Sequence, residues 1–240
     1  MLLYGKNSIL QRLKTNPQSI IKIFLDDVFD DSYILDIASK KRIPIIRLRR
    51  NEFLRLKRAD CLQGIIAEVN KFSYVPFREL LDKGKEENLS FVFLDSISDP
   101  QNLGAIIRTC ACFGGFAVVL PKHYACEVTD TVLHVASGGE NFVPVSMVTN
   151  LSTALIEAKD RGYWAAGAVV EEGQDLNKTE LPFPLCIVLG SEGKGIRQGL
   201  QNQLDLRISL PMIGASLSFN VSIACAIFCY EIIKQKSEKS

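Results

Sequence analysis

The second part of the chain alternates short apolar segments with helical ones, and this alternation limits the possible folds more than any other feature. We predict strands at residues 91–94, 117–120, 142–145, 164–169, 185–189 and 206–210. Helices are predicted at residues 104–113, 129–136, 151–161, 196–202 and 218–234. Strands that are apolar along their whole length are typical of a mostly parallel sheet with helices on both faces. The sequence therefore predicts an α/β fold for this region.

The first 72 residues carry the same kinds of element on a smaller scale. We predict helices at residues 8–14, 32–39 and 51–57, and strands at residues 20–25, 44–48 and 64–69. The stretch that follows contains Pro76, Gly84 and several acidic side chains, which is typical of a linker with a short helix. We therefore expect a small α/β domain over residues 1–72, a linker over 73–89 and a larger domain over 90–240.

Basic side chains are concentrated in one segment, although the net charge of the chain is only +1. Residues 40–58 contain nine lysines and arginines and a single acid, Glu52. Such a concentration is typical of a surface that binds a polyanion, and a solvated basic face is the common alternative. We predict a nucleic-acid partner for this segment. The candidate contact residues are Lys41, Arg42, Arg47, Arg49, Arg50 and Arg55.

The cysteine and histidine content argues against several kinds of chemistry. The seven cysteines form no Cys-x-x-Cys pair, and there are only two histidines, so zinc chemistry and Ser-His-Asp catalysis are poorly supported. His123 and Cys126 lack a second pair of ligands, and we predict no metal. The thiols are expected to be reduced and buried, as in a cytoplasmic protein. Neither a membrane-spanning run nor a signal peptide is visible, so we expect no membrane partner.

Three of the predicted strands lead into loops rich in glycine and polar residues. The first loop and its helix, residues 99–109, contain Asn102 and Arg108. Arginine offers a planar fork of donors that suits a phosphate or a carboxylate. An exposed helical arginine and a capping asparagine would explain the same spacing equally well.

The second loop is Gly190-Ser-Glu192-Gly193-Lys-Gly195. Three glycines in six residues allow a backbone to approach a ligand closely. The spacing matches neither a P-loop nor the dinucleotide-binding fingerprint, which makes a Rossmann dehydrogenase unlikely on sequence grounds. A tight turn is the simpler interpretation, but turn formation alone does not explain a glutamate held among glycines.

The third loop, residues 208–217, joins a strand to a helix that we predict to begin at Ser218. This helix is apolar almost all round, which predicts burial on most sides. Ser218 is a suitable N-cap, so a capped core helix explains the segment. A ligand site is the alternative, because ligands bind at the carboxyl ends of strands in open α/β sheets. The second and third loops can then be neighbours.

Taken together, the three segments resemble, in order and spacing, the three motifs of the SpoU/TrmH family of RNA ribose 2′-O-methyltransferases. The matching stretches are residues 99–109, 189–195 and 210–224. Residues 1–72 also resemble the substrate-binding domain of members that act on large ribosomal RNA, through residues 4–7 and 63–67. Leu62, Leu217 and Phe219 depart from the usual family pattern.

The resemblance implies a deep trefoil knot in the C-terminal domain, S-adenosylmethionine bound at the knot, and a homodimer formed through that domain. The residues implied in cofactor binding are Leu189, Gly190, Glu192, Gly193, Ile208, Leu210, Met212, Leu217 and Ser218. Those implied in catalysis are Asn102, Arg108, Glu192, Ser218 and Asn220.

The reaction implied by the resemblance is methyl transfer to a ribose 2′-hydroxyl of structured RNA, with 23S ribosomal RNA as the expected substrate. A transfer RNA is one alternative, and an RNA-binding relative without catalysis is another. Arg108 is the candidate base in the family. A guanidinium does not readily lose its proton, so a phosphate clamp that stabilises developing negative charge is physically easier.

Overall fold

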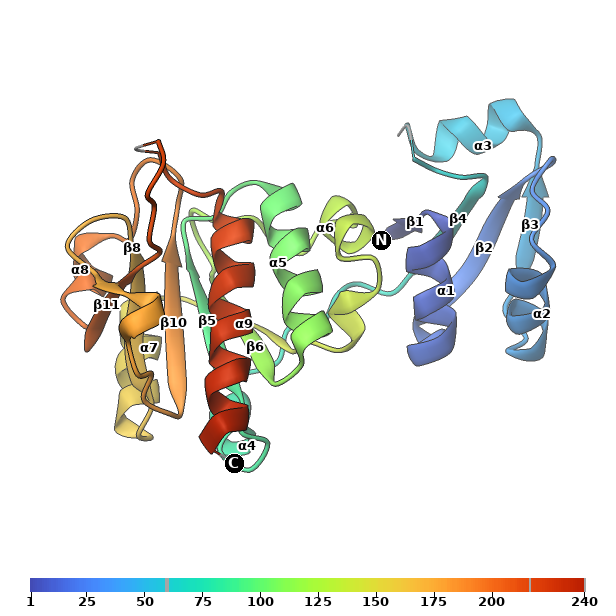
Figure 1. Ribbon diagram of the computed structural model, residues 1–240. Helices are drawn as coiled ribbons and strands as arrows, with labels where there is room; N and C mark the ends of the chain where they lie inside the picture. Colours follow the sequence, from blue (N-terminus) through green and yellow to red (C-terminus); the bar gives the residue numbers. More distant parts are fainter. Residues whose placement is uncertain (59–60, 216, 240) are drawn as a thin grey trace.

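The computed structural model describes residues 1–58, 61–215 and 217–239, which form two sheets joined by a short connection (Figure 1). The first sheet has four strands in the order β1-β4-β2-β3, and the second has seven in the order β7-β6-β5-β10-β8-β11-β9. An α/β fold with a small N-terminal sheet is therefore confirmed.

The N-terminal sheet is mixed. Strand β4 runs antiparallel to β1 and β2, whereas β2 and β3 are parallel. The elements are β1 (Leu2–Tyr4), α1 (Lys6–Thr15), β2 (Ile20–Asp26), α2 (Ser32–Lys40), β3 (Ile45–Leu48), α3 (Arg50–Leu56) and β4 (Ile65–Val69). All six predicted elements are present. The sequence did not reveal β1, because three residues are too few to display an alternating pattern.

All neighbouring strands of the second sheet are parallel, as predicted. They are β5 (Ser90–Asp95), β6 (Phe116–Pro121), β7 (Val145–Val148), β8 (Trp164–Val169), β9 (Gln174–Asp175), β10 (Leu185–Gly190) and β11 (Leu206–Ser209). Strand β7 begins three residues later than predicted, because a 3-10 turn at Gly139–Asn141 uses the N–H groups of Phe142 and Val143.

Helices cover both faces of the second sheet, with α5 and α9 on one face and α7 on the other (Figure 1). Strand β5 illustrates how the sequence covers both faces of the sheet. Val92 and Leu94 belong to one buried cluster, whereas Phe91 and Phe93 belong to the other. The helices are α4 (Phe77–Gly84), α5 (Pro100–Phe113), α6 (Asp130–Ala136), α7 (Leu151–Asp160), α8 (Gln198–Gln201) and α9 (Val221–Lys239).

The start of α9 differs from the sequence-based prediction. The helix begins at Val221, three residues after Ser218. Asn220 is the residue that caps it, because its side-chain oxygen accepts hydrogen bonds from the backbone N–H of Ser222 at 2.9 Å and from the Ser222 hydroxyl at 2.6 Å. The segment before Asn220 is therefore free to form a loop.

The prediction that α9 is buried on most sides holds for residues 221–233, except on the side that carries Ile223 and Tyr230. Cys225, Phe228 and Ile232 are fully buried against the sheet and α5, but Ile223 and Tyr230 are 52% and 59% exposed. An apolar pattern alone cannot distinguish a helix buried within one chain from a helix whose second apolar face is left uncovered.

Strand β11 pairs with β8 on one side and β9 on the other, although both precede it in the chain. After β10, the chain therefore returns and places β11 between two strands that come earlier in the sequence. It then runs back across the sheet as α9, packed against α5 and β10. Such a return is what a knot formed by the C-terminal segment requires.

The two sheets are fixed to one another through α6 and the 3-10 turn that follows it. The ring of His134 stacks on Tyr4 with centroids 4.2 Å apart. Asp130 accepts hydrogen bonds from the N–H of Leu2 at 3.0 Å and from the Lys57 ammonium at 2.8 Å. The joint sets the position of α3 relative to the second sheet (Figure 1).

Candidate active site

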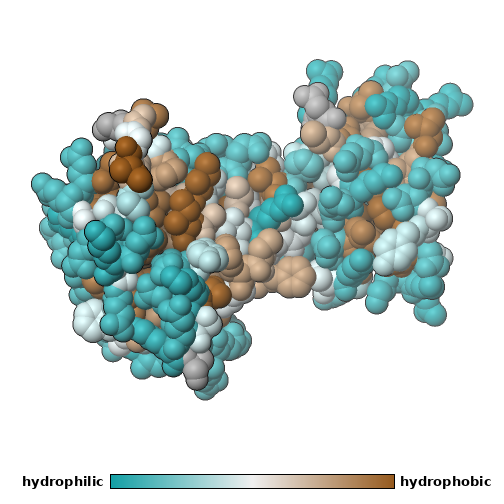
Figure 2. All heavy atoms as spheres, viewed as in Figure 1, coloured by the Kyte–Doolittle hydropathy of each residue, from teal (hydrophilic) through white to brown (hydrophobic). Residues whose placement is uncertain are grey.

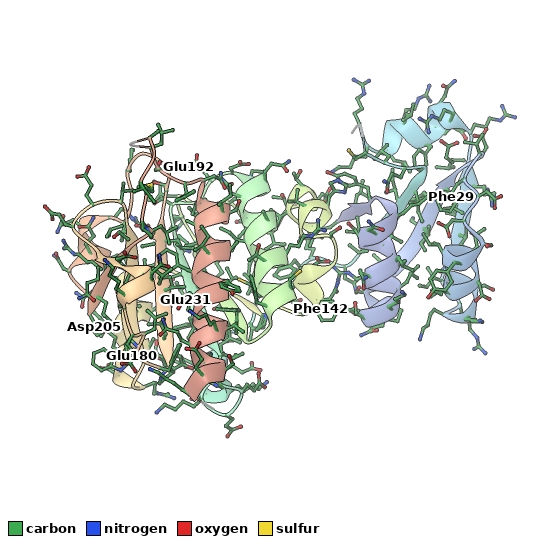
Figure 3. All side chains as sticks on the ribbon, in the orientation of Figure 1. Phe29, Phe142, Glu180, Glu192, Asp205 and Glu231 are labelled. Atoms are coloured by element: carbon green, nitrogen blue, oxygen red, sulfur yellow. The ribbon has the colours of Figure 1, made fainter. Side chains whose placement is uncertain are left out.

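The three polar loops meet in a closed set of hydrogen bonds. The Asn220 amide nitrogen donates to Asn102 Oδ1 at 2.9 Å and to Glu192 Oε1 at 2.6 Å. The Asn102 amide nitrogen donates to the same Glu192 oxygen at 3.4 Å. One side chain from each loop thus contacts the other two. Figure 3 shows Glu192 at the end of the sheet, beside the first turn of α9.

Sheet topology explains why these loops meet. Strands β5 and β10 are parallel neighbours, and their last residues, Asp95 and Gly190, lie directly opposite each other. The connections that leave both strands therefore emerge at one edge. Asn102 lies in the first turn of α5, which Asp99 caps by accepting a hydrogen bond from the N–H of Gln101 at 2.9 Å.

The glycine-rich loop is a tight turn, as its simpler interpretation predicted. The N–H of Gly195 donates to the carbonyl of Ser191 at 2.8 Å, and Gly195 has a φ of +65°. A Cβ atom added to Gly190 would lie 2.1 Å from the carbonyl carbon of Gly195, so no larger residue fits there. The turn also holds Glu192 at the protein surface, where it contacts the other two loops.

A cavity lies beside this hydrogen-bonded set, between the ends of β8, β10 and β11 and the first turns of α9. Six of the nine predicted cofactor-binding residues line it: Leu189, Gly190, Glu192, Leu210, Met212 and Ser218. Three do not. Ile208 is buried within β11, Leu217 is 71% exposed, and Gly193 lies on the outer part of the tight turn.

The cavity wall also includes residues that the sequence did not reveal. Ala168, Val169 and Val170 come from the end of β8, and Val221, Ala224 and Phe228 come from α9. The end of β8 has no polar signature, and the α9 residues were assigned to the core. The enclosed volume is about 100 Å³. This volume is below the range of about 300–1,000 Å³ that is usual for small-molecule sites, and the cavity is open to solvent.

Arg108 stands apart from the hydrogen-bonded set. Its side chain is exposed on α5, and it contacts none of Asn102, Glu192 or Asn220 within the part of the chain that the structure describes. Six residues along a helix correspond to about 9 Å of rise and about 120° of rotation from Asn102. Arg108 instead adjoins Thr109, which lines an apolar groove together with Ile223 and Tyr230 of α9.

Three cysteines form a buried cluster between α5 and α9. The sulfur atoms of Cys110, Cys225 and Cys229 all lie within 4.8 Å of one another, and among the described residues no other group of three potential metal ligands was found. Hydrogen bonds from Cys110 and then Cys225 lower the pKa of the Cys229 thiol to about 5. The sequence did not predict this cluster, because Cys110 comes from α5 and the other two cysteines come from α9.

The remaining thiols correct one expectation. All seven cysteines are free, but Cys61 and Cys112 are exposed, so the prediction of uniformly buried thiols was wrong.

The residues that the structure describes include no helix long and apolar enough to cross a bilayer.

All six predicted nucleic-acid contacts are exposed on the N-terminal unit. Arg50 pairs with the buried Asp26, and Arg47 donates to the carbonyl of Phe29 at 3.1 Å. The side chains of the other four form no ion pair within the described residues: Lys41, Arg42, Arg49 and Arg55. Figures 1 and 3 share one orientation, in which α3 and Glu192 lie toward the same side of the molecule.

Comparisons with known proteins show the family to which this chain belongs. Residues 90–230 match the model of the SpoU rRNA Methylase family, and residues 2–75 match the model for RNA 2′-O ribose methyltransferase substrate binding. The chain is 35% identical over 242 residues to the 23S rRNA (guanosine-2′-O-)-methyltransferase RlmB of Nitrosomonas europaea, covering 99% of this chain and 93% of that protein. It is 40% identical over 176 residues to an uncharacterized tRNA/rRNA methyltransferase of Synechocystis sp., covering 72% of this chain and 46% of that protein.

Solved structures share the fold at lower identity. The complex of the SpoU methyltransferase AviRb from Streptomyces viridochromogenes with AdoMet matches with a TM-score of 0.81 and 19% identity, covering 99% of this chain and 91% of that chain. An AdoMet-bound rRNA methyltransferase from Sinorhizobium meliloti matches with a TM-score of 0.79 and 18% identity, covering 97% and 86%. Given the family model matched over residues 90–230, this chain belongs to the SpoU family and is an RNA 2′-O-ribose methyltransferase with a substrate-binding domain in residues 2–75.

Proposed function

We propose that this enzyme uses S-adenosylmethionine to methylate a ribose 2′-hydroxyl of 23S ribosomal RNA. The observation that carries the proposal is the hydrogen-bonded set of Asn102, Glu192 and Asn220 at the rim of an apolar cavity. The choice of RNA is supported by the near full-length similarity to a relative named for 23S rRNA. A transfer RNA is the second candidate, because another relative is named for both tRNA and rRNA.

The cavity suits the proposed cofactor in its chemistry. Its wall is mostly apolar, with Glu192 and Ser218 among its few polar side chains, and Gly190 lets the turn close tightly against Gly195 beside the cavity. Structural relatives are known with AdoMet bound. When bound, the cofactor supplies an electrophilic methyl group on a positively charged sulfur. We propose that Leu189, Gly190, Leu210 and Met212 contact it.

The chain's own contribution is positioning, which supplies much of the rate of a direct transfer. Glu192 Oε1 accepts from Asn102 and Asn220, and more weakly from the N–H of Val221 at 3.5 Å. Its second oxygen has no hydrogen-bond partner within the described residues. We propose that this free oxygen faces the substrate, while Asn102 and Asn220 keep the carboxylate in place.

Arg108 is proposed to clamp an RNA phosphate and orient the ribose. A guanidinium keeps its proton at any physiological pH, so a clamp is favoured over a base. We expect Arg108→Ala to abolish methylation while S-adenosylmethionine binding, measured by calorimetry, persists. Arg108→Lys keeps the charge but not the fork, and should recover only part of the activity. Joint loss of binding and activity in Arg108→Ala would mean that Arg108 is mainly structural.

We also propose a homodimer that brings Arg108 to the active site. The groove between α5 and α9 is apolar, and Tyr230 makes an edge contact with the exposed Phe113 at 6.4 Å between centroids. Figure 2 shows hydrophobic side chains over the upper part of α9. A Tyr230→Glu variant should sediment as a monomer and lose methylation. A monomeric wild-type enzyme with full activity would exclude the dimer.

A comparison of cells with and without the gene distinguishes the two candidate substrates, 23S rRNA and tRNA. Sites of 2′-O-methylation are mapped in 23S rRNA and in tRNA from cells with and without the gene. We expect one 23S position to lose its methyl group, and restored methylation when the purified enzyme and S-adenosylmethionine are added to that RNA. Loss confined to a tRNA position would establish the second candidate instead.

A further inference from the structure

A second cavity opens at the same edge of the sheet, on the other side of β5 from the proposed cofactor pocket. It encloses about 330 Å³ and is lined by residues that follow β6, β7 and β10, including His123, Tyr124, Asn150 and Arg197. Its volume lies within the range of about 300–1,000 Å³ that is usual for small-molecule sites. No residue of this cavity lines the cofactor pocket.

The cavity is directly connected to the loop that leads to Asn102. The N–H of Cys126, two residues after Tyr124, donates to the carbonyl of Ile97 at 2.8 Å. The fully buried carboxylate of Asp95, at the end of β5, accepts from the backbone N–H of Arg197 at 2.8 Å and from its Nε at 2.7 Å. A ligand in this cavity would therefore lie next to the loop that leads to Asn102 of the proposed active site.

Tyr124 gives the cavity an exposed aromatic surface. Its side chain is 82% exposed, and its hydroxyl has no hydrogen-bond partner within the described residues. Its backbone φ of +63° lies in a region that bulky residues rarely adopt, and strained positions of this kind cluster at functional sites. The ring of His123 lies beside it with centroids 6.5 Å apart. Exposed rings of this kind stack on unpaired nucleobases.

The polar groups of the cavity suit a nucleobase better than a phosphate. Arg197 is paired with Asp95, so the two side chains together carry no net charge, while unused guanidinium N–H groups remain on the half-exposed side chain. The side-chain oxygen of Asn150 accepts from the N–H groups of Ser152 and Thr153, which leaves its amide nitrogen free to donate. An uncharged site with an aromatic face and N–H donors matches the acceptors on a base edge.

We propose that this cavity binds an unstacked base of the RNA, next to the nucleotide whose ribose is methylated. Tyr124 stacks on the base, and Arg197 and Asn150 donate hydrogen bonds to its edge. The site is separate from the basic surface of the N-terminal unit, which attracts the RNA backbone without reading bases. The inference rests on the proposed function for its substrate, since it takes RNA as the bound molecule.

The test measures binding of fluorescein-labelled six-nucleotide RNAs of each single base by fluorescence anisotropy, using the full-length enzyme. Stacking of one base contributes about 1–3 kcal/mol, so Tyr124→Ala should weaken the best-bound RNA by about 5- to 150-fold. Tyr124→Phe keeps the ring and should bind like the wild type. Trp164→Ala is the control, because it removes another half-exposed aromatic ring at the first residue of β8, far from the carboxyl ends of the strands. It should leave the RNA affinity unchanged.

Two outcomes would overturn the inference: equal affinities for Tyr124→Ala and wild type, or an equal loss in Tyr124→Phe. S-adenosylmethionine affinity and thermal midpoint are measured for every variant, because a misfolded variant loses both. Failure of the proposed function and failure of this inference give different results. A wild-type enzyme that does not methylate 23S rRNA would contradict the proposed function, but it would still show base-dependent binding if the cavity binds a base. In an active enzyme, Tyr124→Ala should raise KM for RNA more than it lowers kcat.

Discussion

The edge of the large sheet that carries the proposed active site, called the catalytic edge below, and the basic surface of the N-terminal unit are built in opposite ways. At the catalytic edge, Asn102, Glu192 and Asn220 hydrogen-bond to one another although they come from three distant parts of the chain. On the basic surface, exposed cations such as Lys41 and Arg55 have no acidic partner among the residues described. One region is organised by hydrogen bonds within the chain, and the other leaves its cations without acidic partners among the described residues.

The difference fits the role that we propose for each region, which is methyl transfer for the first and attraction of RNA for the second. Transfer between two bound molecules depends on alignment, and a displacement of about 1 Å can cost about 100-fold in rate. Attraction of an RNA backbone depends on the number of cations and tolerates small movements of each. Single substitutions should therefore have large effects at the catalytic edge and small, additive effects on the basic surface.

The largest effect is expected at Asn220, which has two roles in one side chain. Asn220→Ala removes the cap of α9 and the donors to Asn102 and Glu192, and should lower kcat by about 100-fold through loss of alignment. Loss of the cap should also lower the free energy of unfolding by about 1 kcal/mol. Asn220→Ser keeps a capping oxygen but not the amide donors, so it should lose activity with little loss of stability. Equal activity in Asn220→Ser and wild type would refute the positioning role.

A smaller effect is expected from crowding the glycine turn. Gly190→Ala places a methyl group against backbone atoms of Gly195 and Ile196, so the turn must shift and S-adenosylmethionine affinity should fall by about tenfold or more. Gly214→Ala is the control, because an added Cβ there meets no atom within 4 Å. Calorimetry with the cofactor checks both variants. Unchanged affinity in Gly190→Ala would place the cofactor elsewhere.

Weaker, additive effects are expected on the basic surface. Lys41→Ala and Arg55→Ala should each lower RNA affinity a few-fold and reduce the slope of log affinity against log salt by about 0.7–0.9. Cofactor affinity should be unchanged. Lys40→Ala serves as the control, because Lys40 is already paired with Asp36 at 2.7 Å. A salt-independent RNA affinity in the wild type would contradict the assignment of this surface.

The smallest effect is expected from removing metal ions. The proposed transfer uses positioning by the chain's own side chains, so dialysis against a chelator should leave methylation within about twofold of the untreated enzyme. The experiment is needed because the sulfur atoms of Cys110, Cys225 and Cys229 are potential metal ligands. Metal analysis of the purified protein, and the same dialysis on Cys229→Ala, would show whether a bound ion matters there.

How much the sequence could predict depended on whether the signal was local. The apolar runs predicted the parallel sheet because burial on both faces leaves its mark on every residue of a strand such as β5. The three polar loops could be found because glycine, asparagine and glutamate are unusual at the end of an apolar strand. In each case the deciding residues lie within one short stretch of chain.

What the sequence could not predict arises from contacts between distant segments. The pairing of Asp95 with Arg197 joins residues 102 positions apart, and the apolar end of β8 becomes a cavity wall only because β10 and β11 flank it. The start of α9 was misplaced because Ser218 and Asn220 are both good caps, and the choice between them was made by Asn102 and Glu192.

The joint between the two sheets has a consequence for substrate choice. Arg12 and Glu140 form an ion pair at 2.8 Å that is almost fully buried, and His134 stacks on Tyr4 nearby. Because the joint combines a buried ion pair with stacked rings, we expect it to fix the distance between the basic surface and Glu192. We expect that loosening it would change which nucleotide is methylated before it changes how fast the methyl group moves.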